Sequence, residues 1–178
     1  MLLLVAVWAF AEAVLFFLVA DVPISFVALR HGWRAGAIAA FVAALAATAG
    51  GAVAYGWAVA DPAGAEAAML ALPAIDSALV TETRANLATG AVAAMFWGSL
   101  TGIPYKLYAL AAASGDVAFA SFLLASPFVR LPRFLIAAFG TAAISRLLSG
   151  RIGMWGRLAI LATFWIAFYA RYFSVMSG

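Results

Sequence analysis

The sequence carries a helix-breaking triplet and a lysine inside a long apolar run. Residues 87–113 are mostly apolar or small, yet Gly102, Ile103 and Pro104 interrupt the run and Lys106 follows shortly after them. A backbone in contact with lipid must satisfy its own hydrogen bonds, so a break at membrane depth is tolerated only where protein or a water-filled cavity covers it. A lysine at that depth adds roughly 2.5–3.5 kcal/mol on insertion scales. Two unfavourable features at one point indicate a functional site.

The two arms beside this break are too short to cross a bilayer. Each has roughly ten apolar residues, or about 15 Å of helix, which is about half of the hydrocarbon core. The segment 87–113 is therefore predicted to be a re-entrant hairpin whose tip, with Thr101, Tyr105 and Lys106, lies near the membrane midplane. The alternative is that Lys106 lies at a helix end and extends to the lipid headgroups.

Composition places this hairpin in an integral membrane protein. The chain has 178 residues, of which 68% are hydrophobic and 10% charged, whereas soluble domains have about 25% charged residues. The formal charge of +3 does not indicate a nucleic-acid partner, because the basic residues cluster at the ends of apolar runs. With no cysteine and one histidine, His31, the sequence predicts no disulfide, no thiolate chemistry, no metal site and no cofactor.

A second break occurs near the N-terminus. The run 1–29 is apolar apart from Glu12 and Asp21. Because Glu12 interrupts it and no basic residue precedes it, the run is interpreted as mature structure rather than a signal peptide. Only eight residues separate Asp21 from Arg30, too few for a bilayer of about 30 Å. The segment after Asp21 is therefore predicted either to return part-way, which makes a second re-entrant hairpin broken at Pro23, or to lie at the interface.

The chain is interpreted as one polytopic membrane domain, 1–178, of the all-α class, with two inverted re-entrant hairpins plus spanning helices. Residues 35–60 are predicted to span the membrane, and their many alanines and glycines favour close helix packing. The last helix ends in an aromatic and basic belt at 169–173. The four parts are a first repeat with its hairpin at 1–60, an extramembrane amphipathic connector at 61–86, a second repeat with its hairpin at 87–148 and a C-terminal transmembrane helix at 149–178.

The acidic connector, 61–86, has two interpretations. It could form an amphipathic helix on the outer surface, with apolar residues facing lipid. It could equally be a solvated link. The apolar residues concerned are Met69, Leu70, Leu72 and Ile75.

The charge distribution supports the hairpins independently of their length. If each hairpin returns to the side from which it entered, the basic loops at 30–34 and 146–157 lie on one side and the acidic connector lies on the other. The positive-inside rule requires this arrangement. The two halves are then inverted repeats, and broken segments at corresponding positions of such repeats indicate a transporter's midplane site. We expect a multi-pass protein of the cell inner (plasma) membrane.

Five charged side chains lie within apolar segments: Glu12, Asp21, Lys106, Arg130 and Arg133. Such charges normally face a bundle interior, pair with one another and mark a substrate or proton path. Arg130 and Arg133 share one helical face, and with Lys106 they would favour an anionic group such as a phosphate. Glu12 and Asp21 are predicted to couple to protons. The alternatives are that Glu12 pairs with an arginine for assembly alone, that Asp21 caps a helix, and that the arginines are interface anchors.

Several short segments along the chain carry a family resemblance. They are Glu12 followed by Asp21-Val22-Pro23, Gly50-Gly51 with Tyr55-Gly56, Ile103-Pro104-Tyr105-Lys106-Leu107-Tyr108 followed by Ala111 to Gly115, and Phe128-Val129-Arg130-Leu131-Pro132-Arg133-Phe134. In this pattern the chain resembles the DedA superfamily, also called SNARE-associated Golgi or VTT proteins, and within it the short YqaA-like branch. Where many members have Gly-Asp, this chain has Gly50-Gly51, and Thr101 stands where they have an arginine before the re-entrant proline.

The resemblance implies a fold of two facing re-entrant hairpins and a role in moving lipids, notably undecaprenyl phosphate or phospholipids, with proton dependence. It makes Glu12 and Asp21 the acidic pair and Lys106 with Arg130 the basic pair. The sequence therefore predicts a transporter that flips or scrambles an anionic lipid or lipid phosphate. Its expected partners are membrane lipids and protons, and its Ala- and Gly-rich faces permit a homodimer.

Two other classes of function compete with the transporter. One is a structural or assembly protein in which the intramembrane charges only pair. The other is a membrane enzyme that modifies a lipid, which is disfavoured because the sequence offers no set of nucleophile, histidine and acid. The protein is accordingly predicted not to be an enzyme.

Overall fold

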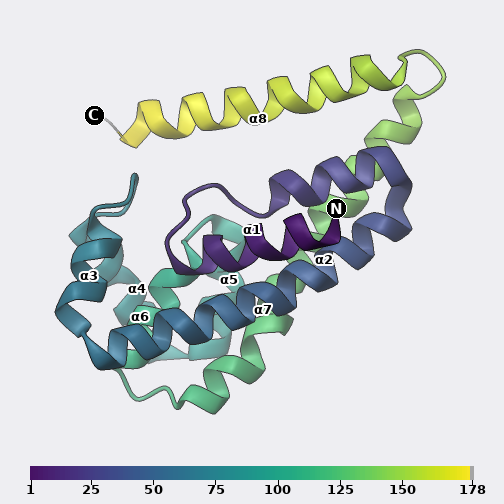
Figure 1. Ribbon diagram of the computed structural model, residues 1–178. Coiled ribbons are helices and arrows are strands. Elements are labelled where there is room, and N and C mark those ends of the chain that lie inside the picture. The colour runs from purple at the N-terminus through teal and green to yellow at the C-terminus, as the bar shows by residue number, and fades with distance from the viewer. Residues whose placement is uncertain (177–178) are drawn as a thin grey trace.

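A computed structural model of the chain describes residues 1–176 and shows an all-α fold (Figure 1). Among the described residues, those outside helices are Met1 and the short connections between helices. The helices of the described residues are α1 (Leu2–Val14), α2 (Asp21–Ala60), α3 (Pro62–Leu70), α4 (Ser77–Thr89), α5 (Ala91–Thr101), α6 (Tyr105–Ser114), α7 (Phe119–Leu148) and α8 (Met154–Met176).

Two helices of the described residues, α2 and α7, are long and apolar enough to cross a membrane. The 30 residues of α7 extend about 45 Å, compared with a hydrocarbon core of about 30 Å. The crossing predicted for 149–178 stays a prediction: α8 forms most of this segment, and residues 177–178 lie outside the described residues.

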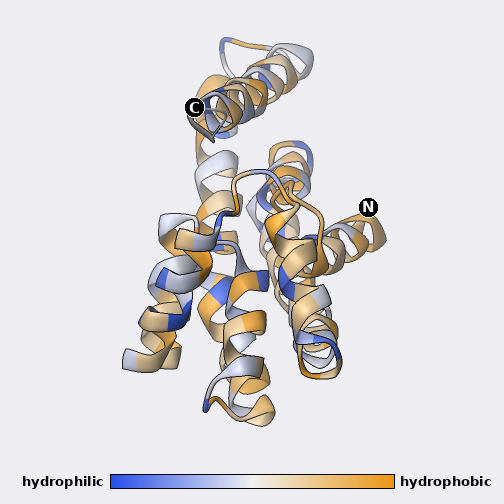
Figure 2. Cartoon of the chain, turned by 90° about the vertical axis from the view of Figure 1, so that its left-hand side faces the viewer, coloured by the Kyte–Doolittle hydropathy of each residue, from blue (hydrophilic) through white to orange (hydrophobic). Residues whose placement is uncertain are grey.

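Large apolar side chains cover much of the molecular surface. Figure 2 shows that apolar residues extend along most of the chain. Exposed examples are Leu3, Leu124, Phe128, Leu147, Trp155 and Ile166. A soluble monomer rarely exposes a contiguous apolar patch larger than a few hundred Å², so this surface agrees with the membrane protein that composition predicts.

A single glycine replaces the predicted basic loop at 30–34. The helix α2 continues through this segment, and Gly32 alone leaves helical geometry, with φ 83° and ψ 179°. Positive φ is accessible to glycine at no steric cost because it lacks Cβ. The predicted loop is wrong: the chain makes a kink at one residue, and the two parts of α2 run in different directions on either side of it (Figure 1).

Two helix–break–helix hairpins are present, and the sequence located one break correctly. α5 ends at Thr101, Gly102 adopts left-handed geometry with φ 100°, and Pro104 is the N-cap of α6. The first hairpin breaks over 15–20, before α2 begins. Pro23 therefore lies in the first turn of α2 rather than at the break, because the first N–H groups of a helix have no intrahelical partner to lose.

Two of the connector residues that are predicted to face lipid pack against the protein instead. Met69 is 1% exposed and Ile75 is 7% exposed, and both belong to a cluster with Leu107 and Leu110 of α6. The prediction that they face lipid is wrong, whereas Leu70 is exposed. The connector comprises two helices, of which α4 extends to Thr89.

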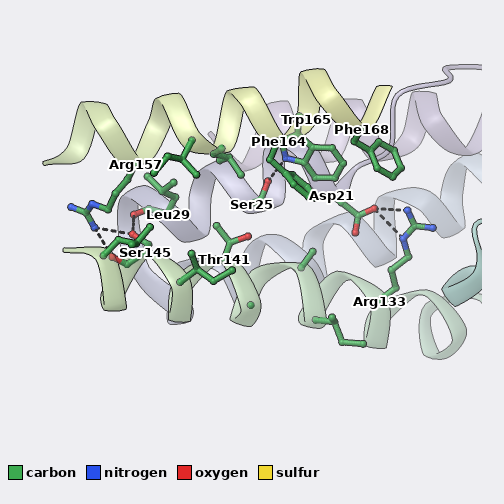
Figure 3. A pocket seen from close by; sticks show the side chains of 17 residues that line it. Asp21, Ser25, Leu29, Arg133, Thr141, Ser145, Arg157, Phe164, Trp165 and Phe168 are labelled. Carbon is green, nitrogen blue, oxygen red and sulfur yellow. Dashed lines mark hydrogen bonds and ion pairs between the residues drawn. The ribbon is translucent and has the colours of Figure 1, made fainter. Parts of the chain in front are cut away.

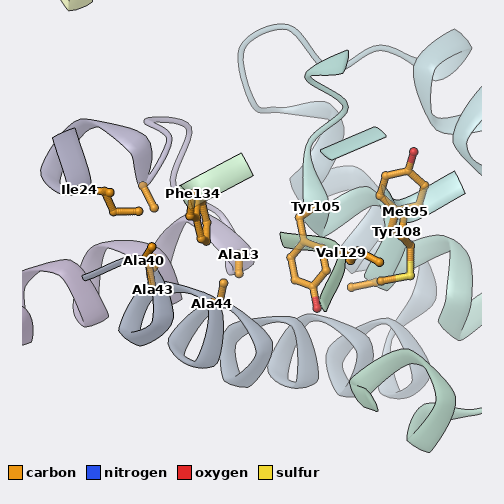
Figure 4. Packing of buried hydrophobic residues seen from close by; sticks show 14 of the residues in the cluster. Ala13, Ile24, Ala40, Ala43, Ala44, Met95, Tyr105, Tyr108, Val129 and Phe134 are labelled. Carbon is orange, nitrogen blue, oxygen red and sulfur yellow. The ribbon is translucent and has the colours of Figure 1, made fainter. Parts of the chain in front are cut away.

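Small residues build the central core. Six alanines of α1 and α2 are fully buried where α1 and α7 pack against α2, and Phe134 of α7 fills the space beside them (Figure 4). Small side chains let helix backbones approach closely, so packing contacts rather than apolar burial hold helices together within lipid. The alanines are Ala9, Ala13, Ala39, Ala40, Ala43 and Ala47.

Gly50 offers a direct test of this packing. A Cβ at Gly50 would lie 2.5 Å from the carbonyl oxygen of Phe10 and 2.9 Å from Cβ of Ala13. Backbone cannot move aside as a flexible side chain can, so Gly50→Leu is expected to cost about 1–3 kcal/mol by overpacking. The matched control is Gly56→Leu on the same helix, since a Cβ at Gly56 would meet nothing within 4 Å. Thermal unfolding in detergent measures both, and equal midpoints would contradict the packing described.

Candidate functional site

A cavity of about 320 Å³ lies between the breaks of the two hairpins, the face of α7 and one side of α8. Most of the predicted site residues line it: Glu12, Thr101, Gly102, Pro104, Tyr105, Lys106, Arg130 and Arg133. Asp21 lines a neighbouring groove instead, and Pro23 is buried in α2. The structure thus brings together side chains separated by more than a hundred positions in the sequence.

The first charged group of the cavity is a buried ion pair. Arg130 donates from a terminal nitrogen to the carboxylate of Glu12, and each residue is 6% exposed. The guanidinium carbon lies 4.6 Å from the ring centre of Tyr105 and 4.8 Å from that of Phe134. Among the described residues, Nε of Arg130 has no hydrogen-bond partner although it is buried. This arginine therefore has a donor left over.

Arg133 joins the two hairpins. Its guanidinium lies 2.9 Å from the carboxylate of Asp21, at the start of α2, and also donates to the carbonyl oxygen of Ser99 in α5 at 2.9 Å. The alternative role of Asp21 as a cap is not what the geometry shows, because α2 has no side-chain cap. One side chain of α7 thus holds both broken segments at the same place.

Lys106 contributes a buried cation that forms no ion pair among the described residues. It is 3% exposed, and its Nζ donates to the carbonyl oxygen of Phe16, in the break of the first hairpin, at 3.0 Å. It therefore points into the protein rather than toward headgroups. Within residues 1–176, no carboxylate forms an ion pair with it. An ammonium has three donors, so two remain for another acceptor.

Tyr105 and Thr101 have other partners for their hydroxyl groups. Tyr105 donates to Oγ of Ser126, and its ring stacks on Phe122 with 5.6 Å between the centres. The face of its ring packs against the guanidinium of Arg130. Thr101 donates to the carbonyl oxygen of Trp97 in its own helix at 3.0 Å. Neither hydroxyl points to a free substrate position, although both residues line the wall.

The sequence did not indicate the wall formed by α8. Phe168, Tyr169 and Tyr172 line the cavity, and the hydroxyl of Tyr169 accepts from the backbone N–H of Val19 at 2.8 Å. The sequence predicts an interfacial belt for the aromatic run at 169–173. Its spacing of three and four residues, which places side chains on one helix face, is the available signal for a packed surface.

The two basic segments, 30–34 and 146–157, lie at one end of the molecule. Gly32 and Trp33 of α2 line a cavity of about 490 Å³ together with Arg146 and Arg157. The connector helices lie at the far end of α2 from this cavity (Figure 1). This separation is the arrangement of charge that a protein obeying the positive-inside rule would need.

No family model, curated protein or solved structure matches this chain. Within the described residues, no group of three or more His, Asp or Glu side chains could hold a metal ion. The resemblance to the DedA superfamily stays a prediction.

Proposed function

We propose that this protein is a membrane transporter of the DedA type that binds the phosphate of an anionic lipid in the central cavity and flips or scrambles that lipid. The observation that carries the proposal is the buried, unpaired ammonium of Lys106. Burying a charge without an ion-pair partner is unfavourable, so a bound anion would stabilise the Lys106 ammonium. The proposed setting is the cell inner membrane.

The other cations favour a phosphate as that anion. Arg130 has a buried Nε without a partner in the part of the chain that the structure describes, and Arg133 lines the same cavity. Charge-assisted hydrogen bonds from guanidinium groups to phosphate oxygens are among the strongest in proteins. With both carboxylates already paired to arginines, the cavity retains one positive charge for the ligand.

Protons would act through the carboxylates. Protonation of Glu12 would remove the negative charge that now holds Arg130 and would leave this guanidinium free to bind phosphate. Loss of the proton would restore the ion pair and favour release. Competition between this carboxylate and a phosphate for one arginine is the proposed basis of proton coupling.

The test is a translocation assay in reconstituted liposomes. Fluorescent phosphatidylglycerol, fluorescent phosphatidylcholine and a polyprenyl phosphate are compared for the wild type and for Lys106→Ala. We expect the wild type to move the phosphate-bearing anionic lipids and Lys106→Ala to lose at least about 90% of that rate, which is the loss of one charge-assisted contact. Arg84→Ala is the control, since Arg84 pairs with Glu66 on the surface connector. Movement of no lipid by a folded preparation would overturn the proposal.

A structural or assembly role is the second candidate, and one observation favours it. Both intramembrane carboxylates are paired with arginines: Glu12 with Arg130 and Asp21 with Arg133. In that role the charges hold the hairpins together and bind nothing else. Under this alternative Lys106 joins the hairpins through its hydrogen bond to Phe16, but the absence of an ion-pair partner for its charge among the described residues is not explained.

A further inference from the structure

A separate apolar groove runs beneath α8. It encloses about 460 Å³ between α8, the first part of α2 and the second half of α7. Figure 3 shows the Arg157 side chain at one end and the Asp21–Arg133 ion pair at the other. The lining between these ends is mostly apolar and comprises Leu29, Ile136, Ile144, Ile160, Leu161 and Phe164 among others.

Polar contacts hold α8 over this groove at three points. Arg157 donates to Oγ of Ser145 at 2.8 Å, Trp165 donates to Oγ of Ser25 at 3.0 Å, and Tyr169 accepts from the backbone of Val19 at 2.8 Å. The helix is therefore fixed in place while the space below it is left unfilled by side chains. Empty apolar space forfeits van der Waals contacts, and water needs two to four polar partners, of which the stretch between the two ends offers few. An apolar chain is the occupant that suits such a space.

The end of the groove at Arg157 is suited to an anionic headgroup. Nε of Arg157 is buried and has no hydrogen-bond partner among the described residues, and none of their carboxylates forms an ion pair with this arginine. Here the groove adjoins the cavity lined by Arg146 and Trp33. Basic pockets between helices on the cytoplasmic side of a membrane bind anionic lipid headgroups, and the sequence predicts that this basic end is cytoplasmic.

The length of the groove agrees with one acyl chain. Along α7, about 18 Å separate Ser145 from Arg133 at about 1.5 Å per residue, and one leaflet of the hydrocarbon core is about 15 Å deep. We propose that the groove beneath α8 binds one acyl chain of an anionic phospholipid, with the lipid's phosphate at Arg157. This site goes beyond the proposed function because it requires binding alone, without any movement of lipid through the central cavity.

The first test maps where a lipid chain lies. The probe is phosphatidylglycerol with a photoactivatable diazirine in the middle of one acyl chain, mixed into phosphatidylcholine liposomes that contain the full chain. We expect labelled peptides from the inner faces of α7 and α8, around Thr141 and Leu161, at several times the yield from the outward face around Leu124. Uniform labelling of all lipid-facing helices would overturn the proposal, and so would cross-links showing a second copy of the chain in the groove.

A substitution that fills the groove provides the second test. Gly140 lines the groove, and a Cβ there would meet nothing within 4 Å, so Gly140→Leu occupies the space without a clash. We expect labelling of α8 to fall about tenfold, equivalent to about 1.4 kcal/mol of binding free energy. Gly56→Leu, which also enters open space, is expected to leave the labelling unchanged. Unchanged labelling in Gly140→Leu would overturn the proposal.

The third test isolates the headgroup. Arg157→Gln is expected to lower labelling by the phosphatidylglycerol probe about tenfold, because a charge-assisted contact is lost, while Arg84→Gln leaves it unchanged. Equal labelling by the same probe in Arg157→Gln and the wild type would refute the headgroup position. Lys106→Ala is expected to retain labelling in the groove even where translocation is lost, so a failure of this inference and a failure of the proposed function give different results.

Discussion

Glu12→Gln is expected to destabilise the protein by about 3–5 kcal/mol, because it leaves the guanidinium of Arg130 buried without a counter-charge. Both partners are only 6% exposed. The matched control is Glu66→Gln. The side chains of Glu66 and its partner Arg84 are 36% and 39% exposed, and an exposed pair contributes about 0–1 kcal/mol. Denaturant unfolding in detergent gives both free energies, and equal losses would contradict the buried geometry.

The double variant Glu12→Gln with Arg130→Gln separates the two candidate functions. Removing both charges leaves neither member of this pair buried without its partner, so folding is expected to recover most of what the single change loses. If the pair serves assembly alone, the double variant keeps its cellular phenotype. Under the proposed function it folds but no longer moves lipid. Full translocation by the double variant would remove Arg130 from the proposed mechanism.

Lys106→Met is expected to abolish lipid translocation while changing the free energy of unfolding by no more than about 1 kcal/mol. Removing an intramembrane ammonium recovers roughly 2.5–3.5 kcal/mol on insertion scales. Losing its hydrogen bond to the carbonyl oxygen of Phe16 costs about 1.5–3 kcal/mol, so the two effects nearly cancel. Methionine keeps a similar length and an apolar stem. If Lys106→Met keeps its stability but loses transport, the charge of Lys106 serves to bind a ligand rather than to stabilise the fold.

The comparison for this variant is Lys106→Arg, which retains the charge and is expected to retain part of the activity. Thermal unfolding and the liposome assay are measured on the same preparations. A loss of stability in Lys106→Met as large as that in Glu12→Gln would instead show that this lysine holds the two hairpins together. Transport would then be lost through misfolding.

Local stereochemistry decided which parts of the fold the sequence could predict. Gly102 and Pro104 mark their break directly, because one adopts positive φ and the other cannot continue a helix. The break predicted at Pro23 is wrong, because proline is also tolerated in the first turn of a helix. The basic, aromatic segment 30–34 predicts a loop, but one glycine in an otherwise helical segment, Gly32, is enough to change the direction of the helix.

Tertiary packing decided the rest. The sequence singled out the charged residues of the apolar segments, but the pairing of Glu12 with Arg130 and of Asp21 with Arg133 depends on how α1, α2 and α7 pack. Met69 was misassigned because an apolar residue that faces lipid and one that faces another helix look alike in sequence. For the same reason, the sequence did not show that side chains of α8 line the cavity.

The contacts of Arg133 oppose separation of the two hairpins, and this has a consequence for the permeability of the membrane. Its guanidinium bonds both to Asp21 and to the backbone of Ser99, so separating the two hairpins breaks charge-assisted bonds of about 1.5–3 kcal/mol each. Without a ligand, such opening is slowed at least about tenfold for each bond broken. A phosphate that replaces the lost contacts removes that barrier. Under the proposed transport function, the protein without a bound lipid would therefore stay closed to ions and protons.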